Sequence, residues 1–129
     1  MQKSNELSRI LKQSFDWNKA DCLTGMLIGL IKTRSVSLNE IAMGFPSDAM
    51  PDSRYRRIQR FIHDYEINFD TVAVFVMTLF HFISSKYYLT LDRTNWKWGK
   101  KNINILMLAI AYKGVAIPIY WKLLDKSLT

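Results

Sequence analysis

The sequence has few of the residues that would cross-link the chain or carry it through a membrane. Its 129 residues include one cysteine, Cys22, so an internal disulfide framework is excluded and a reducing interior is expected. Its longest apolar stretches, residues 22–31 and 71–83, are shorter than the roughly 20 residues of a spanning helix. Gly25 and Gly29, four residues apart, therefore predict close packing of helices in a soluble core. With a polar opening segment that lacks a secretory signal, we expect a cytoplasmic protein without a membrane partner.

Acidic residues are scarce, above all in the second half. The whole chain has 18 Lys and Arg against 11 Asp and Glu, which gives a net charge of +7. Residues 1–70 are nearly balanced, with ten against nine, whereas residues 71–129 carry eight against two. This excess favours a polyanionic partner, and we expect double-stranded DNA. The predicted DNA-binding residues form two runs: Arg54, Arg56, Arg57 and Arg60, then Arg93, Lys97, Lys100 and Lys101.

The first 85 residues are expected to be helical. Apolar residues recur at helical spacing, and turn-forming residues separate the helices. Ser37 and Glu40 make a capping-box pattern at the start of a short helix that ends at Gly44. Asp52 or Ser53 is expected to cap the helix that follows. The predicted helices are residues 4–14, 17–33, 38–43, about 53–65 and 71–84.

From Tyr87 onward the pattern predicts strands. A short strand over residues 87–92 is expected to end in a charged loop over residues 93–101. Residues 103–112 are apolar on both alternating faces, which is typical of a strand covered on both sides. Lys113 and Gly114 predict a tight hairpin turn into the last strand, and Pro118 predicts that this strand is a sheet edge.

The helix at residues 53–65 is predicted to separate its apolar and basic side chains. On a helical wheel, Tyr55, Ile58, Phe61, Ile62 and Tyr65 gather on one side, and Arg56, Arg57, Arg60 and His63 on the other. Arg54 projects into the apolar arc, with a stem long enough to reach water. The arrangement resembles the second helix of a helix-turn-helix, although the preceding loop is longer than usual. The alternative is a solvated surface, but no acidic residue interrupts positions 53–63, so nucleic-acid contact is favoured.

Asp92 is the candidate for catalysis. Alternation places it with Thr90 on one face of its strand, at the predicted strand end. A carboxylate there, followed by basic residues, can hold a divalent cation beside a phosphodiester. An aspartate that only starts a turn is the alternative interpretation.

Three sequence runs around Asp92 resemble a known family. They are LTLDRTNW at residues 89–96, KKNINILML at residues 100–108 and YKGVAIP at residues 112–118. Together they are similar to the start of the catalytic domain of DDE-type insertion-sequence transposases, over about residues 87–124. The preceding helices are similar to the DNA-binding region of that family. The resemblance implies a ribonuclease-H-like fold whose first three strands are antiparallel, with the first acidic metal ligand at the end of strand one.

The resemblance also implies a mechanism in which three acidic residues bind two Mg²⁺ or Mn²⁺ ions, cut the transposon end and join it by phosphoryl transfer. Only Asp92, as catalytic residue and metal ligand, has a counterpart here; the only later carboxylate, Asp125, has no reason to replace the others. A lone carboxylate should hold Mg²⁺ weakly or not at all. The expected fold is therefore α+β: a helical DNA-binding domain over residues 1–85, then an incomplete ribonuclease-H-like catalytic domain over residues 86–129.

The expected function is that of a truncated transposase that binds transposon ends and is inactive alone. The alternative is a stand-alone DNA-binding protein or a regulator of transposition without catalysis. An open edge on the first strand would favour self-association, and full-length transposase is a second candidate partner.

The other polar and aromatic residues are weaker candidates for a functional site. His81, inside an apolar stripe, is expected to be a hydrogen-bonded core residue, and one cysteine with two separated histidines gives no zinc spacing. Trp96 and Trp98, beside basic residues, either stack on bases or cover the end of the sheet.

Overall fold

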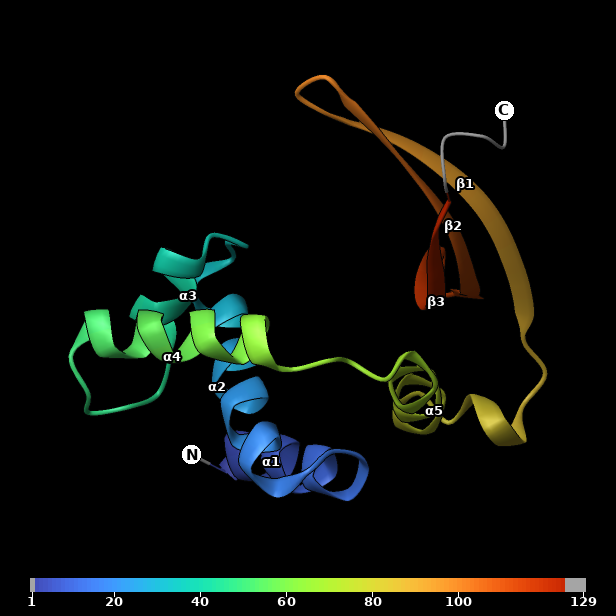
Figure 1. The fold of residues 1–129 in the computed structure, drawn as a ribbon. Coiled ribbons are helices and arrows are strands. Elements are labelled where there is room, and N and C mark those ends of the chain that lie inside the picture. The colour runs from blue at the N-terminus through green and yellow to red at the C-terminus, as the bar shows by residue number, and fades with distance from the viewer. Residues whose placement is uncertain (1, 125–129) are drawn as a thin grey trace. The chain divides into compact units, whose positions relative to one another are not determined.

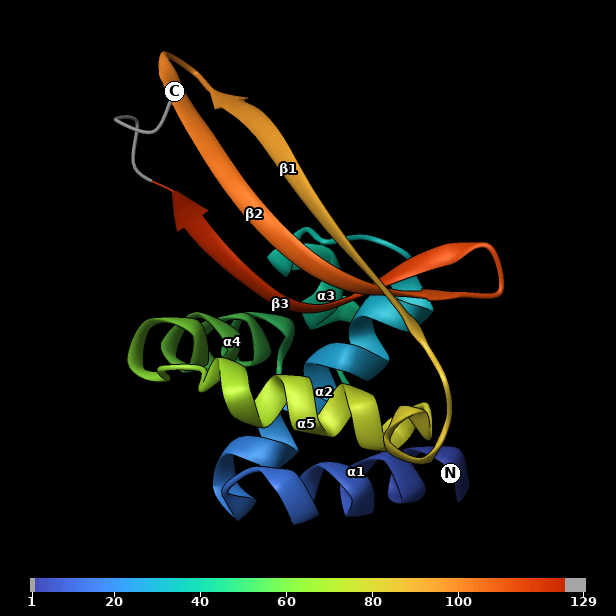
Figure 2. The same cartoon turned by 90° about the vertical axis from the view of Figure 1, so that its right-hand side faces the viewer.

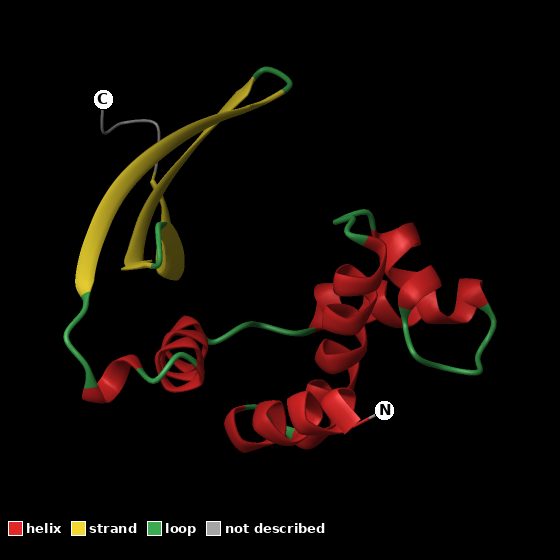
Figure 3. Ribbon diagram, turned by 180° about the vertical axis from the view of Figure 1, so that it is seen from behind, coloured by secondary structure: helices red, strands yellow, loops and turns green. Residues whose placement is uncertain are grey.

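The protein is α+β, with all its helices before its strands (Figures 1 and 3). The structure is a computed structural model and describes residues 2–124. Five α-helices, a short 3₁₀ helix (η1) and three strands follow one another along the chain. They are α1 Gln2–Ser14, α2 Trp17–Thr33, α3 Leu38–Gly44, α4 Pro51–Asp64, α5 Phe69–Leu79, η1 Phe82–Ser84, β1 Tyr88–Trp98, β2 Lys101–Tyr112 and β3 Val115–Leu124.

The chain divides into two compact units, Met1–Ile67 and Asn68–Thr129. This division falls earlier than the predicted domain boundary at residue 85, because α5 packs on β3 and belongs with the sheet. The assignment of the two parts to DNA binding and catalysis stays a prediction.

The first unit is built around α2, α3 and α4. Its buried side chains are Cys22, Ile41, Ala42, Phe45 and Ile58, and Met26, Leu30, Leu38, Tyr55 and Phe61 pack against them. The two glycines of α2 allow this packing, as predicted. A Cβ atom on Gly25 would collide with the ring of Phe45, and one on Gly29 would collide with the carbonyl oxygen of Ile41.

One predicted helix cap is found in position but without its hydrogen bond, and a second is wrong. The Ser37 side chain makes no capping hydrogen bond, although Ser37 does precede α3. Neither Asp52 nor Ser53 caps α4; that helix begins earlier, at Pro51, with Met50 in the cap position. Proline is well suited to the first helical position because its φ angle is already helical and its missing N–H would have no helical partner there. Because the prediction treats proline as a helix breaker, the predicted start lies about two residues too late.

The apolar segment after residue 68 is not one continuous helix. The Asn68 side chain caps α5 by accepting a hydrogen bond from the Thr71 N–H at 3.1 Å. The helix ends at Leu79, and His81 takes a left-handed conformation with φ of 57° before η1. The chain therefore turns where a helix through residue 84 was predicted. His81 is exposed and Phe82 is buried in its place, so the prediction of a core histidine is wrong.

The three strands form an antiparallel sheet in the order β1-β2-β3, with β2 in the centre (Figure 2). Lys113 and Gly114, with φ of 47° and 81°, make the predicted turn between β2 and β3. Pro118 lies on an edge strand, also as predicted. Between Leu108 and Ala109 the register with β3 shifts, leaving Ile119 as an extra residue. A bulge beside a proline is expected because Pro118 has no N–H to donate.

Strand β1 is longer than predicted, and the charged loop over residues 93–101 does not exist. The strand continues to Trp98 and pairs with β2 along its whole length, from Tyr88 opposite Ala111 to Trp98 opposite Lys101. Gly99, with φ of 58°, begins the turn. Thr94, Trp96 and Trp98 favour extended backbone, and this preference outweighs the polarity of the segment.

Helical cover lies on one face of the sheet. Phe82, Ile110 and Ile119 form the buried cluster there, with Val76, Met77 and Leu108 packed against it. On the opposite face of β2, the side chains of Ile103, Ile105 and Met107 are half-buried between the neighbouring strands. Within the described part of this unit, the coverage of both faces predicted for β2 is therefore found on one face only.

Candidate nucleic-acid interface

Helix α4 presents a basic surface because its apolar residues are used by the core. Ile58 is fully buried, and Tyr55 and Phe61 pack beside it. The residues between them are turned outward: Arg56, Arg57, Arg60 and His63 are exposed. The predicted separation of the two faces is thus present except at Ile62, which was expected on the packed side and is 51% exposed. The acidic residues of this helix lie only at its ends, at Asp52 and Asp64.

Arg56 and Arg60 lie together, one helical turn apart. They line a shallow hollow with Ser53 and Gln59. The Arg60 Nε donates a long hydrogen bond of 3.4 Å to the Arg56 carbonyl oxygen. Two guanidinium groups, a hydroxyl and an amide on one open surface are suited to hydrogen-bonding phosphate oxygens.

At the C-terminal end of α4, His63 lies beside an acid. Its Nδ1 is 2.6 Å from the Asp64 Oδ1, and both side chains are exposed. A protonated His63 would therefore have part of its charge compensated locally. The strongest positive charge of the helix lies further toward its N-terminus.

Arg57 is shared between the surface and the core. Its guanidinium carbon lies 5.4 Å from the centre of the Phe45 ring, within the range of a cation–π contact. Burial raises the pKa of the Cys22 thiol, and the neighbouring Arg57 charge and hydrogen bond partly oppose that shift. Arg57 therefore stabilises the α2–α4 packing in addition to being exposed.

Arg54 has a local role that the sequence analysis missed. Its Nε donates to the Ala49 carbonyl oxygen at 2.9 Å. One terminal nitrogen donates to the carbonyl oxygens of Met43, at 3.3 Å, and Phe45, at 3.1 Å. The guanidinium thus holds the end of α3 and the loop that leads into α4. Arg54 was predicted to bind DNA; these three bonds engage its Nε and one terminal nitrogen within the protein, and DNA contact by Arg54 stays a prediction.

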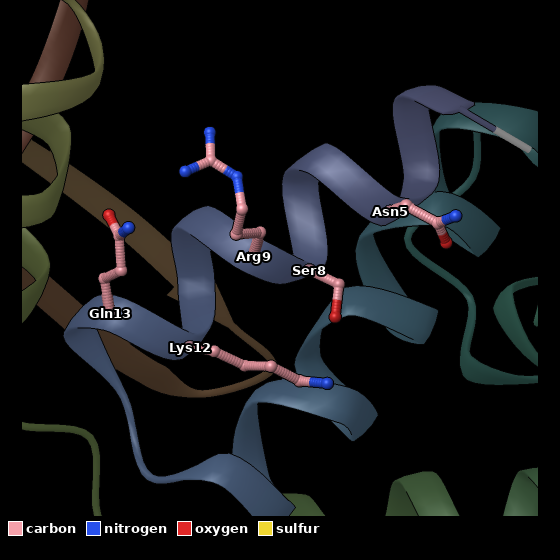
Figure 4. A pocket seen from close by; sticks show the side chains of 5 residues that line it. All are labelled: Asn5, Ser8, Arg9, Lys12 and Gln13. Carbon is pink, nitrogen blue, oxygen red and sulfur yellow. The ribbon is translucent and has the colours of Figure 1, made fainter.

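A second polar hollow lies along α1, lined by Asn5, Ser8, Arg9, Lys12 and Gln13 (Figure 4). Lys12 extends from it to form an ion pair with Asp21 of α2, with 2.9 Å between Nζ and Oδ1. The hollow was not predicted, although the spacing of its residues at three and four positions would have placed them on one helical face. Because Lys12 is already paired, we assign no ligand to this hollow.

Asp92 lies inside β1 and not at its end. It is the fifth residue of an eleven-residue strand and pairs with Met107 of β2. Its side chain is exposed, and Oδ1 accepts a hydrogen bond of 2.8 Å from the N–H of Arg93. The interpretation that Asp92 starts a turn is wrong, because the strand continues for six residues beyond it. The strand-end position implied by the transposase resemblance is not found either.

The basic residues after Asp92 do not gather around it. Side chains alternate between the two faces of a strand, so Arg93 and Lys97 lie on the face opposite to Asp92. Lys101 shares the Asp92 face but pairs with Trp98, near the hairpin tip, and Lys100 is in the turn. The predicted arrangement, with cations holding a phosphate beside Asp92, is therefore not formed by Arg93 or Lys97.

The residues present do not make up a metal site. Among residues 2–124, no group of three or more His, Cys, Asp or Glu side chains comes together. Asp92 is the only acidic residue between positions 87 and 124, and Asp125 lies outside the described residues. A hard cation such as Mg²⁺ needs several oxygen ligands, often including substrate phosphates. We derive no catalytic step from Asp92 alone.

Trp96 and Trp98 lie on the Asp92 face of β1. They are 62% and 72% exposed, so they do not cover the end of a core. Their stacking on bases stays a prediction.

Comparison with known proteins gives no relative. No protein-family model, curated protein or solved structure matches this chain. In the part of the chain that the structure describes, no helix has the length and apolar character needed to cross a membrane.

Proposed function

We propose that this chain is a DNA-binding protein of the DDE-transposase type, in which α4 contacts the phosphate backbone of double-stranded DNA. The observation that carries this proposal is the exposed surface of Arg56 and Arg60 on a helix whose other side is anchored by the buried Ile58. Guanidinium groups on a rigid helix can bind phosphates without a large loss of side-chain entropy. The transposase resemblance adds transposon ends as the expected sites.

The arrangement of α3 and α4 supports the same proposal. These consecutive helices pack against each other and against α2, as in helix-turn-helix proteins. Residues 45–50 form a longer connection than the usual tight turn, but the Arg54 hydrogen bonds fix it at both ends. The longer loop is therefore compatible with a defined orientation of α4.

A salt titration of DNA binding tests this proposal. Each phosphate contact contributes about −0.9 to the slope of log K against log salt concentration. We expect R56A/R60A to lower this slope by about 2 and to weaken binding to a labelled duplex by about tenfold or more at low salt.

The matched control is K32A/R34G, which removes the same charge from the same unit. Arg34 has φ of 54°, so glycine suits this position. We expect this variant to bind DNA nearly as the unmodified chain does. Equal losses in both double variants would mean that only net charge matters, and the assignment to α4 would be rejected.

For the sheet, we propose that β1–β3 are the opening antiparallel strands of a ribonuclease-H-like fold, with Asp92 as one of its metal ligands. The antiparallel order of the three strands supports this proposal, although Asp92 lies within β1 and not at its end. Because the residues present do not complete a metal site, the 129 residues are expected to bind DNA without cutting it. Nicking of supercoiled DNA that requires Mg²⁺ and is lost in D92A would contradict this expectation.

A regulator of transposition, or a stand-alone DNA-binding protein, is the second candidate. Among the described strands, β1 pairs on one side only, with β2. This favours the second candidate, since an edge strand can join a second copy or full-length transposase by strand addition. A regulator should inhibit a full-length transposase. The D92A variant should inhibit it as strongly as the unmodified chain when both occupy the same fraction of the DNA. Sequencing the DNA downstream of the gene, for a frame that supplies two further acidic residues, distinguishes it from a transposase.

A further inference from the structure

One face of the sheet lacks helical cover within the described part of the second unit. The helical cover packs on the side of Leu108 and Ile110, whereas Asp92 and the residues in register with it lie on the other side. We call this other side the open face. Its large apolar members are Tyr88, Trp96, Trp98, Ile103, Ile105, Met107 and Leu123, and the aromatic residues and Leu123 among them are exposed. A contiguous apolar surface of this kind is typical of an interaction site.

The open face carries one acid and one base. Asp92 lies opposite Met107, and Lys101 lies opposite Trp98, nearer the hairpin tip. Neither Asp92 nor Lys101 makes an ion pair with another described residue. Burying a charge without a partner is costly. A surface that covers the open face must therefore supply a cation for Asp92 and an anion for Lys101.

The positions of these two charges fit a second copy of the same chain. In a two-fold symmetric contact every pair of residues occurs twice, so Asp92 of each copy can meet Lys101 of the other. The two residues are six positions apart along the strands and one strand apart across them, which corresponds to about 20 Å and about 5 Å.

This spacing also sets the angle between the two sheets. A two-fold axis that lies midway between Asp92 and Lys101, parallel to the sheet and perpendicular to the line joining them, makes the strands of the two copies cross at about 30°. Aligned sheets pack face to face with their strands within about 30° of each other and about 10 Å apart. The lysine and aspartate side chains together can span this gap.

The size of the open face is sufficient for a weak dimer. Three strands of 10 to 12 residues, about 4.8 Å apart, cover about 500 Å². Two copies together would bury about 1,000 Å², which is where specific interfaces begin. Trp121 borders the open face at the β3 edge, and its ring centre lies 5.0 Å from that of Phe69 of α5. The surface that a partner can reach is therefore centred on β1 and β2.

We propose that two copies of this chain dimerise through their open faces, with reciprocal ion pairs between Asp92 of one copy and Lys101 of the other. This surface differs from the edge of β1, because the two sheets stack and no strand is added to either. Such a dimer requires neither DNA nor a metal ion, so its presence or absence leaves the assignment of DNA binding to α4 unchanged.

Nucleic acid and lipid fit the open face less well. The Asp92 carboxylate would repel a phosphate backbone laid on this face. Trp96 and Trp98 are suited to a membrane interface, but an anionic lipid surface would cover Asp92 without giving it a cation. A second copy supplies Lys101 at this point.

Exchanging the charges of the two positions tests the proposal. D92K places a lysine opposite Lys101 of the other copy, and K101D places an aspartate opposite Asp92. Each variant should weaken dimerisation by about tenfold or more, since like charges meet twice across the interface. The double variant D92K/K101D has opposite charges again and should recover most of the affinity. Sedimentation equilibrium of the full chain over a wide range of concentration measures the dissociation constants.

K113D is the matched control, because it makes the same change of charge as K101D in the β2–β3 turn, outside the open face. It should dimerise as the unmodified chain does, and circular dichroism should show the same strand content in all four variants. A dimer formed through the edge of β1 would not be restored in D92K/K101D, since Lys101 lies on β2. Absence of this rescue, or an equal loss in K113D, would overturn the proposal. A monomeric unmodified chain would also overturn it, and binding of that monomer to anionic vesicles, lost in W96A/W98A, would assign the open face to a lipid surface.

Discussion

The two units of this protein place their charge in different ways. In the first unit, cations and acids are nearly balanced in number, and the basic surface arises because α4 turns its arginines away from Ile58. In the second unit, eight Lys and Arg outnumber three acidic residues, and the alternation of the strands decides which cations lie together. The basic surface of α4 therefore arises because helical periodicity places the arginines of a mixed sequence on one side. In the sheet, the cations come from a segment, residues 93–124, that has no acidic residue.

The units also differ in how they bury apolar side chains. Three helices surround the buried cluster of the first unit, including Ile58, while helical cover reaches one face of the sheet in the second. Each cluster nevertheless has a fully buried isoleucine, Ile58 and Ile110, both at 0% exposure. These residues give matched probes of the two cores.

The largest expected effect is the loss of either isoleucine. I58A and I110A should each lower the free energy of unfolding of their own unit by about 2–5 kcal/mol, since each leaves a cavity. Hydrogen exchange measured by mass spectrometry should show faster exchange in residues 2–67 for I58A and in residues 68–124 for I110A. Faster exchange across both units in either variant would contradict the division into two units.

The glycine at the crossing of α2 and α3 gives the next largest effect. G29A should destabilise the first unit by about 1–3 kcal/mol, because its methyl group meets the Ile41 carbonyl oxygen and the backbone must move. G114A is the comparison in the second unit: it has open space around it but a φ of 81°, so its cost comes from the backbone conformation. Urea denaturation measures both. A stability of G29A equal to that of the unmodified chain would mean that the two helices are not in close contact.

Variants of Arg54 test whether DNA binding by α4 depends on the loop that Arg54 holds in place or on the charge of Arg54 itself. R54A should cost about 1–2 kcal/mol of stability, since three carbonyl oxygens lose a charged donor. DNA affinity should fall while the salt slope stays unchanged, because no phosphate contact is removed. R54K keeps the charge but not the planar set of donors, so it should not restore affinity. A reduced slope in R54A would instead place Arg54 on the DNA.

Local chemistry decided which parts of this fold were predictable from sequence. The turn at Lys113 and Gly114 was found because two apolar runs flank a glycine directly. The turn at Gly99 was missed because charged residues on both sides obscured the alternation of Thr94, Trp96 and Trp98. Helical periodicity gave the outward face of α4, since an apolar stripe fixes the orientation of all other residues on the helix.

Contacts between distant residues were not predictable. The bonds of Arg54 depend on the path of the loop before α4, and no local pattern reports that path. The placement of Arg93 and Lys122 on either side of Leu106 depends on the register of two hairpins and on the bulge at Ile119. The break after Leu79 depends on packing of Phe82 beneath the sheet, which the apolar run of residues 71–84 does not reveal.

The smallest expected effect concerns the one cysteine, and it should be confined to the first unit. Because burial raises the pKa of the Cys22 thiol, the folded state favours the neutral form. The contribution of the neutral Cys22 thiol to the stability of the folded state is therefore complete below the ordinary thiol pKa of about 8.5. It is lost as the pH rises through the higher pKa of the thiol in the folded protein. Urea denaturation between pH 7.5 and 9.5 should show a small decline in the stability of the first unit that is absent in C22A. A decline of the same size in C22A would assign it to other groups, because the variant cannot form a thiolate.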